Sequence, residues 1–247
     1  MFLAQKLGEI LYKNSYSIYK PLYFTYKNIF EKNEILFFKS VIENNNFVVD
    51  IGANIGFYSI LFSKIVNDAG RVFAFEPEKN NFQKLLQNTK HLKNVQCINA
   101  AISDKTDTIK IYPSEFGLNV DFRTYPTKKT DSPLDIVNAF SLDDFLSLNK
   151  ISKVDFIKMD IQGYEYYALS GMTNTLKNNI NIKLFMEFWP YGIQKTGIQP
   201  IQIINLLKDL NFNIYLFNNG KLLPTTNIEN NLSYSPDVNY HLYCSKI

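Results

Sequence analysis

The sequence predicts one doubly wound α/β domain preceded by a helical N-terminal segment. Three observations predict this fold class. Short apolar runs alternate with stretches of helical periodicity through most of the chain. Four of the apolar runs close on a carboxylate residue, namely Asp50, Glu76, Asp160 and Glu187. The 247 residues, of which 46% are hydrophobic, suffice for one large core.

The expected elements follow one another in the order that successive βαβ units require. The apolar runs predict strands at residues 47–51, 72–77, 95–102, 154–160, 182–187, 214–217 and 240–244. Helical spacing predicts helices at 57–66, around Phe82, Leu85 and Leu86 as residues of the inner face, after a cap at Ser141, and at 165–176 and 200–210. The polar stretch 112–135 contains three prolines and is interpreted as a hairpin or loop excursion.

Residues 1–46 differ from the rest and are interpreted as a helical cap on a main domain of residues 47–247. Tyrosines and phenylalanines recur there at spacings of three and four, and lysines recur every seven residues. Pro21 interrupts this pattern, so we expect two helices with Pro21 near the start of the second. Three roles remain open for the aromatic rows: packing on the main domain, a dimer seam, or peripheral contact with a membrane surface.

Charge and cysteine content restrict the class of protein. The 26 basic and 23 acidic residues are scattered, without the basic block that would indicate nucleic acid as a partner. No stretch predicts a transmembrane segment or a secretory signal, so we expect a cytoplasmic protein. Cys97 and Cys244 lack metal-site spacing and are interpreted as buried small hydrophobic residues.

The segment DIGANIG at residues 50–56 lies where a strand ends and a helix begins. Glycines there let a ligand approach the backbone at the helix N-terminus. A dinucleotide fingerprint would need a glycine where Asn54 stands, which disfavours a pyrophosphate and hence a nicotinamide-dependent oxidoreductase, the alternative enzyme class. S-adenosylmethionine has no phosphate, so Asp50, Gly52 and Gly56 would suffice for it.

Glu76 closes the second predicted strand, 26 residues after Asp50. This separation suits one βαβ unit and brings both carboxylates to the same edge of the sheet. A carboxylate at this position accepts hydrogen bonds from the two hydroxyls of a ribose. The two positions together favour a nucleoside-containing cofactor, S-adenosylmethionine.

Five motifs, in this order and spacing, resemble those of the FkbM-type methyltransferases. The resemblance covers roughly residues 47–187, and the last motif is the most specific. They are DIGANIG at 50–56, FEP at 75–77, NAA at 99–101, SLDD at 141–144 and DFIKMDIQGYE at 155–165.

The resemblance implies a Rossmann-like sheet of seven strands in the order 3-2-1-4-5-7-6, with cofactor over strands one to three. In that order Cys97 and Cys244 would lie five strands apart, roughly 24 Å, too far for a disulfide. Members of the family resemble O-methyltransferases that act on sugars, glycans and hydroxylated natural products. A small-molecule or glycan acceptor is therefore implied near the ends of strands four and five.

The resemblance also assigns roles to individual residues. The methionyl part of the cofactor would lie against the 50–56 motif, the ribose against Glu76, and the adenine against residues 99–101. Residues on the acceptor side would include Lys158 and Glu165, with Asp160 or Glu187 as the base that takes the hydroxyl proton. The residues implied for the cofactor are Asp50, Gly52, Ala53, Asn54, Gly56, Glu76, Asn99 and Ala101.

Several of these roles have structural alternatives. Asp160 could cap a helix or orient the cofactor, and Glu187 could pair with Lys158. Many family members carry Glu where this chain has Gln162, which leaves open a non-catalytic glycan- or partner-binding module on the same fold. Trp189 is either an aromatic floor for a sugar ring or a core residue. No metal is expected, and His91 and His241, isolated in the sequence, are not expected to act as the base.

Overall fold

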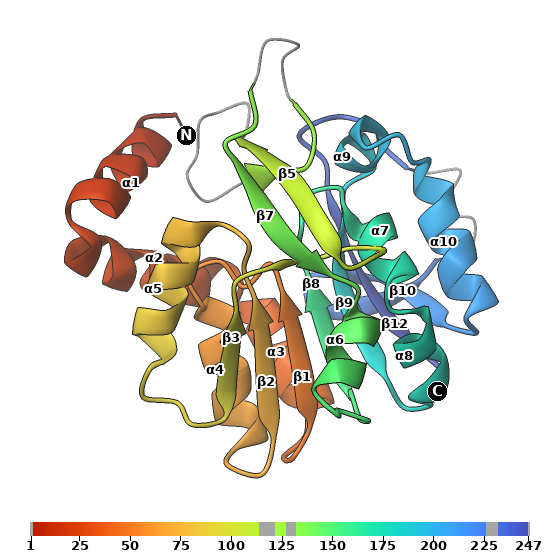
Figure 1. Ribbon diagram of the computed structural model, residues 1–247. Helices are drawn as coiled ribbons and strands as arrows, with labels where there is room; N and C mark the ends of the chain where they lie inside the picture. The colour runs from red at the N-terminus through yellow and green to blue at the C-terminus, as the bar shows by residue number, and fades with distance from the viewer. Residues whose placement is uncertain (1, 114–121, 127–131, 226–231, 247) are drawn as a thin grey trace.

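The structure, a computed structural model, describes residues 2–113, 122–126, 132–225 and 232–246. Its central sheet has eight strands among these residues, in the order β11-β10-β12-β9-β8-β1-β2-β3 (Figure 1). The strands from β3 to β9 are parallel, and the other three are antiparallel. Their bounds are β1 Phe47–Ile51, β2 Arg71–Phe75, β3 Val95–Ile98, β8 Phe156–Met159, β9 Lys183–Phe188, β10 Asn213–Asn218, β11 Lys221–Pro224 and β12 Tyr240–Ser245.

The expected count of seven strands is wrong by one, because β10 folds back into β11. Asn219 and Gly220 form the turn, with φ angles of 49° and 81°. Two successive residues with positive φ give the tight hairpin that matches the twist of paired strands. The remaining seven strands lie in the order β3-β2-β1-β8-β9-β12-β10, with the carboxyl ends of β1, β2 and β8 side by side.

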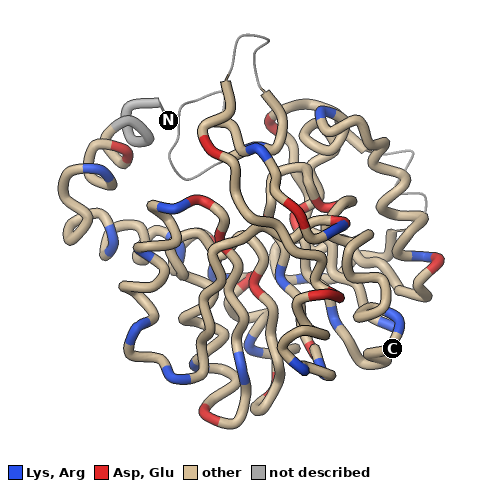
Figure 2. Tube along the Cα trace, viewed as in Figure 1, with Lys and Arg blue, Asp and Glu red and all other residues tan. Residues whose placement is uncertain are grey.

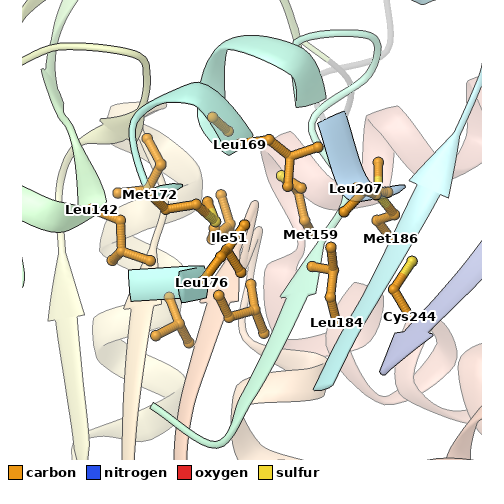
Figure 3. Close-up of a cluster of buried hydrophobic side chains, with 14 of the residues drawn as sticks. Ile51, Leu142, Met159, Leu169, Met172, Leu176, Leu184, Met186, Leu207 and Cys244 are labelled. Carbon is orange, nitrogen blue, oxygen red and sulfur yellow. The ribbon is translucent and has the colours of Figure 1, made fainter. Parts of the chain in front are cut away.

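Helices cover both faces of the sheet, so the predicted α/β class is confirmed. Along each strand, alternate side chains face opposite layers. Val48 and Val72 pack against α3 and α4, while Val49 and Phe73 belong to a larger core on the other face. Figure 3 shows side chains that the helices contribute to this larger core, namely Leu142 of α6, Leu169 of α7, Leu176 of α8 and Leu207 of α10. The helices are α3 Lys32–Val41, α4 Phe57–Val66, α5 Lys79–Thr89, α6 Leu142–Leu148, α7 Glu165–Ser170, α8 Thr173–Asn178, α9 Pro190–Lys195 and α10 Pro200–Asp209.

A second, four-stranded sheet replaces the predicted continuation of the third strand. The expected single strand over 95–102 divides, because the Asn99 side chain donates to the carbonyls of Glu76 and Pro77 and the chain then pairs Ala101 with Ala139. Part of the excursion expected at 112–135 belongs to this sheet, and residues 114–121 and 127–131 lie outside the described residues. Its strands, in the order β4-β7-β5-β6, are β4 Ala101–Ile102, β5 Asp107–Pro113, β6 Phe122–Arg123 and β7 Asp135–Phe140.

Two helix predictions also need correction. The helix expected over 165–176 is two short helices that meet near Gly171, where a Cβ atom would lie 1.8 Å from the Ser103 carbonyl oxygen. This close approach requires glycine at the point where α7 ends. Leu86, expected on the inner face of α5, is 39% exposed, whereas Leu85 is fully buried.

The N-terminal segment forms α1 Phe2–Asn14 and α2 Tyr16–Phe30 before α3. The break falls at Ser15, and Pro21 lies within α2, where it leaves the helix without one backbone donor. Tyr12 and Tyr19 are buried together with Ile55, so one aromatic row packs on the main domain. Ile18, Leu22, Tyr26 and Ile29 form a second row that is more than half exposed. A dimer seam and membrane contact stay predictions for this outer row.

Basic and acidic residues are interspersed over the described chain (Figure 2). In this part of the chain no helix is both long and apolar enough to cross a membrane. Cys97 and Cys244 are free and lie on β3 and β12, five positions apart in the sheet. Their separation in the sheet is the expected one, and Cys244 is buried as expected, whereas Cys97 is only half-buried.

Candidate active site

A cavity of about 260 Å³ lies at the carboxyl ends of β1, β2 and β8. This is where ligands bind in open α/β sheets. The second sheet contributes Ile109, Ile111 and Phe122 to its wall. Seven of the predicted site residues line the cavity: Gly52, Ala53, Asn54, Glu76, Ala101, Lys158 and Asp160. The predicted residues Asp50, Gly56, Asn99 and Glu187 do not line it.

The loop after β1 is held tightly by its neighbours. Gly52 has a φ angle of 79°, and a Cβ atom there would lie 2.1 Å from the carbonyl oxygen of Asp160. The backbone N–H groups of Gly52 and Ala53 both donate to the carbonyl of Phe75. Glycine is therefore required here, because any side chain would collide with the loop after β8. The same close contact couples the loop after β1 to the loop after β8, so that a shift of one would displace the other.

Glu76 is buried at the end of β2, with its carboxylate fixed by backbone donors. The N–H of Asn54 lies 2.8 Å from one carboxylate oxygen, and the N–H of Glu78 lies 2.9 Å from the other. Burial outweighs these hydrogen bonds and raises the pKa of Glu76 to about 7. Since each oxygen has two lone pairs, the carboxylate keeps acceptor capacity for further donors in the cavity.

Asp50 lies behind the cavity wall rather than on it. It is fully buried, and one of its oxygens accepts a hydrogen bond of 2.6 Å from the Ser59 hydroxyl. The other oxygen has no hydrogen-bond partner among the described residues. Burial raises the pKa of Asp50.

Gly56 and Asn99 shape the loops that carry the lining residues. Gly56 is the N-cap residue directly before α4 and has a φ angle of 91°, and a Cβ atom there would lie 2.7 Å from a methyl carbon of Leu85. Asn99 ties the turn after β3 to residues 76 and 77 through its two hydrogen bonds. Ala100 and Ala101, the next residues, therefore reach the cavity wall.

The other end of the cavity is polar and lies after β8 and β9. Asp160 lies 3.4 Å from the ammonium of Lys158. Burial alone would raise the pKa of Asp160, but the charges of Lys158 and Lys27 hold it below its usual range. Burial, followed by the charge of Asp160, raises the pKa of Glu187 well above its ordinary value. The two carboxyl groups therefore differ in their affinity for a proton.

Gln162 connects these two carboxyl groups. Its amide nitrogen lies 3.0 Å from an oxygen of Asp160 and 2.9 Å from an oxygen of Glu187. Its amide oxygen accepts a hydrogen bond of 2.6 Å from the guanidinium of Arg123 on β6. Arg123 also lies over the ring of Trp189, at 4.3 Å from its centroid.

Trp189 is buried and does not line the cavity. Its indole N–H donates to the carbonyl of Pro236, and Arg123 lies against its ring. Of the two roles left open by the sequence, packing is therefore the one that the contacts fit.

The N-terminal helices contribute side chains that sequence reasoning missed. Tyr23 and Lys27 of α2 line the cavity. Glu31 accepts hydrogen bonds from both Lys27 and the hydroxyl of Tyr58, which also lines it. The seven-residue spacing of the lysines and the aromatic row were the available signals, but neither indicates which lysine faces inward.

A smaller adjoining cavity joins β8, β9 and β12. Lys158, Asp160 and Glu187 line it together with His241, whose ring nitrogen lies 3.8 Å from Glu34. His241 therefore lies beside the candidate carboxylates, although its place in the sequence gave no sign of this. Burial lowers the pKa of His241.

Glu165 has a structural position at the start of α7. Its side chain accepts hydrogen bonds from the backbone N–H groups of Ile161 and Gly163, and it lines neither cavity. It therefore fixes the loop that carries Gln162. Within the described ranges, no three Asp, Glu, His or Cys residues are grouped as a metal ion requires.

Comparison with known proteins identifies the family. A family model described as the methyltransferase FkbM domain matches residues 50–214. The chain is 27% identical over 168 residues to the hexuronic acid methyltransferase AglP of Haloferax volcanii, covering 68% of this chain and 63% of that protein. It is 29% identical over 143 residues to the 2-O-methyltransferase NoeI of Sinorhizobium fredii, covering 52% of this chain and 58% of that protein. The match spans about three fifths of the length of each relative.

Solved structures show the same fold at low sequence identity. A Streptococcus mutans protein solved in complex with SAH is 14% identical, with a TM-score of 0.51, and covers 87% of this chain and 97% of that one. An rRNA methylase from Streptococcus thermophilus is 10% identical, with a TM-score of 0.51, covering 89% and 96%. The chain thus has the fold of S-adenosylmethionine-dependent methyltransferases, and it belongs to the FkbM methyltransferase family.

Proposed function

We propose that this chain transfers a methyl group from S-adenosylmethionine to a hydroxyl of a sugar or glycan. The observation that carries the proposal is that Glu76 and Asp160 line one cavity, with Gly52 between the loops that hold them. The names of the relatives, a hexuronic acid methyltransferase and a 2-O-methyltransferase, support a sugar hydroxyl as the acceptor.

The residues at the β1 and β2 ends fit the cofactor, which supplies an activated methyl group when bound. The free lone pairs of Glu76 suit the two ribose hydroxyls. Ala100 and Ala101 give an apolar wall for the adenine. Gly52, Ala53 and Asn54 line the part of the cavity assigned to the methionyl group. Asp50, buried next to this loop, keeps one carboxyl oxygen without a hydrogen-bond partner among the described residues.

Asp160 is the base in this proposal, because it is the acceptor-side carboxylate that lines the cavity. The carboxylate of Asp160 would accept the proton that the acceptor hydroxyl loses when its oxygen takes the methyl group, with S-adenosylhomocysteine as the leaving group. Lys158, 3.4 Å away, keeps Asp160 ionised before the reaction. Glu187 lies behind it and holds Gln162 from the other side. The site thus mainly positions the acceptor and removes its proton.

Two measurements test this function. Calorimetry with S-adenosylhomocysteine should show binding to the purified chain, and no heat would contradict the cofactor assignment. A screen with methyl-labelled S-adenosylmethionine against uronic acids, neutral sugars and lipid-linked glycans should then yield a labelled ether. Binding without any labelled product would favour a non-catalytic binding module. Family membership gives the nicotinamide-dependent alternative no support.

A further inference from the structure

The side chain of Gln162 makes three hydrogen bonds, each to an ionisable group. Its amide nitrogen donates one hydrogen to Asp160 and one to Glu187, at 3.0 Å and 2.9 Å. Its amide oxygen accepts from Arg123 at 2.6 Å. Both hydrogens of the amide are therefore used, and each joins a carboxylate from a different strand end.

These contacts admit only one orientation of the amide. If it were turned by half a rotation, its oxygen would face two carboxylate oxygens at about 3 Å and its nitrogen would face a guanidinium, with repulsion on both sides. Arg123 is itself held by the ring of Trp189. The second sheet therefore fixes the direction in which Gln162 presents its donors.

The backbone at this position is also constrained. Gln162 has a φ angle of 59°, which is unusual for a residue other than glycine, and Gly163 follows at 100°. A Cβ atom on Gly163 would lie 2.5 Å from the backbone of Gly192. Glu165 accepts two hydrogen bonds from this loop. Strained conformations of this kind persist where the surroundings over-determine them, and they concentrate at functional sites.

Resting on the proposed function, we propose that Gln162 is a positioning residue that bridges Asp160 and Glu187 and favours the ionised form of Asp160 toward the acceptor. Two neighbouring carboxylates ordinarily share a proton or a cation. Here one neutral amide supplies a donor to each of them, in addition to the ammonium of Lys158, which lies 3.4 Å from Asp160. A glutamate at position 162 would instead place a third carboxylate between them.

Other groups also act on these two carboxyls, and the test must separate their effect from that of Gln162. None of them changes when residue 162 alone is substituted. The charged and titratable groups that face the pair, besides Arg123, are Tyr23, Lys27, Glu31, Glu34, Asp50, Tyr58, Lys158, Glu165 and His241.

The test is a ¹³C NMR titration of the carboxyl groups of Asp160 and Glu187 in the full chain, assigned with Asp160→Asn and Glu187→Gln. Gln162→Met keeps the length of the side chain but removes both donors, and should raise the pKa of Asp160 by about one unit. Gln162→Glu should raise it at least as much. Gln83→Glu, the same charge change at an exposed position on α5, should leave it unchanged.

A wild-type measurement keeps the proposal testable if the variants fail to fold. Both Nε2 protons of Gln162 should exchange with solvent at least tenfold more slowly than those of exposed Gln83. Unchanged titration of Asp160 in folded Gln162→Met, or fast exchange of both protons, would overturn the proposal. Affinity for S-adenosylhomocysteine should stay within about threefold in all variants. If the wild type fails to bind it, the proposed function fails, while the titrations still decide the role of Gln162.

Discussion

The two ends of the cavity are built in different ways. At the β1 and β2 ends, the polar contacts are made mainly by backbone groups within one βαβ unit, as when the N–H groups of Asn54, 22 residues earlier, and Glu78, two residues later, fix Glu76. At the β8 and β9 ends, the contacts join side chains from distant segments, as when Gln162 meets Arg123, 39 residues earlier, and Glu187, 25 residues later.

This difference has a consequence for function. The cofactor end depends on local loop geometry, which a short motif can encode. The acceptor end depends on the positions of the second sheet and of the last strands of the central sheet. Such a region can vary between enzymes that act on different acceptors. Changes at one end should therefore leave the other intact, except at Gly52, where the two loops touch.

Gly52→Ala should have the largest effect, since the new methyl would lie 2.1 Å from the Asp160 carbonyl and must displace both loops. We expect calorimetry to show at least a 100-fold loss of affinity for S-adenosylhomocysteine. Gly197→Ala is the matched control, because Gly197 has a similar φ of 88° but open space around it. It should cost only about 1–2 kcal/mol of unfolding free energy and leave binding unchanged. Equal losses of affinity in Gly52→Ala and Gly197→Ala would contradict the claim that the loops after β1 and β8 are coupled.

Asp160→Asn should reduce methyl transfer without weakening cofactor binding, so it distinguishes the two ends of the cavity. It removes the proposed base while keeping the shape of the side chain, so methyl transfer should fall by about 10²- to 10⁴-fold. Affinity for S-adenosylhomocysteine should change by less than about threefold. Transfer is measured with the acceptor found in the screen, and Glu187→Gln serves as the comparison. If Glu187→Gln abolishes transfer and Asp160→Asn does not, Glu187 is the base.

Glu76→Gln should weaken binding of S-adenosylhomocysteine by roughly 10- to 100-fold, because an amide replaces the charged acceptor proposed for the ribose hydroxyls. Calorimetry measures the effect, with exposed Glu43→Gln as the control. Retention of full affinity would mean that the ribose lies elsewhere.

The pH dependence of binding should be the smallest effect. The pKa of Glu76 in the free protein is raised to about 7, so most molecules carry a proton there at pH 6. Ribose donors favour the carboxylate, so binding must expel this proton, and affinity should rise about tenfold between pH 6 and pH 8. Calorimetry in buffers of different ionisation enthalpy should detect the released proton. The dependence should vanish in Glu76→Gln, and its persistence there would assign it to another group.

Some secondary-structure elements were predicted correctly from the sequence and others were not. The strand at 47–51 and the helix at 57–66 were predicted to the residue, because a fully buried strand and an amphipathic helix are both encoded in local hydrophobic periodicity. The strand expected over 95–102 was wrong, since a run of apolar residues does not reveal that the chain leaves one sheet for another after Ile98.

The residues of the candidate site also divide into those that the sequence predicted and those that it did not. Glu76 and Gly52 were predicted from the strand ends and the glycine spacing, and Asp160 and Lys158 from resemblance to the family; all four line the cavity. Asp50 and Gly56 of the same glycine motif do not line it. Arg123, Tyr23, Lys27 and His241 were missed as site residues. Each of them reaches the site through an element whose position depends on long-range packing rather than on its neighbours in sequence.

By itself, the sequence determined the alternation of strands and helices, and with it the edge of the sheet where a ligand would lie, because hydrophobic periodicity and glycine turns are local properties of the chain. Only the tertiary structure decided which side chains close the cavity and how Gln162 bridges two carboxyl groups. Those contacts join residues far apart in the chain, and their energies depend on burial and on the sum of surrounding charges, neither of which exists before the chain is folded.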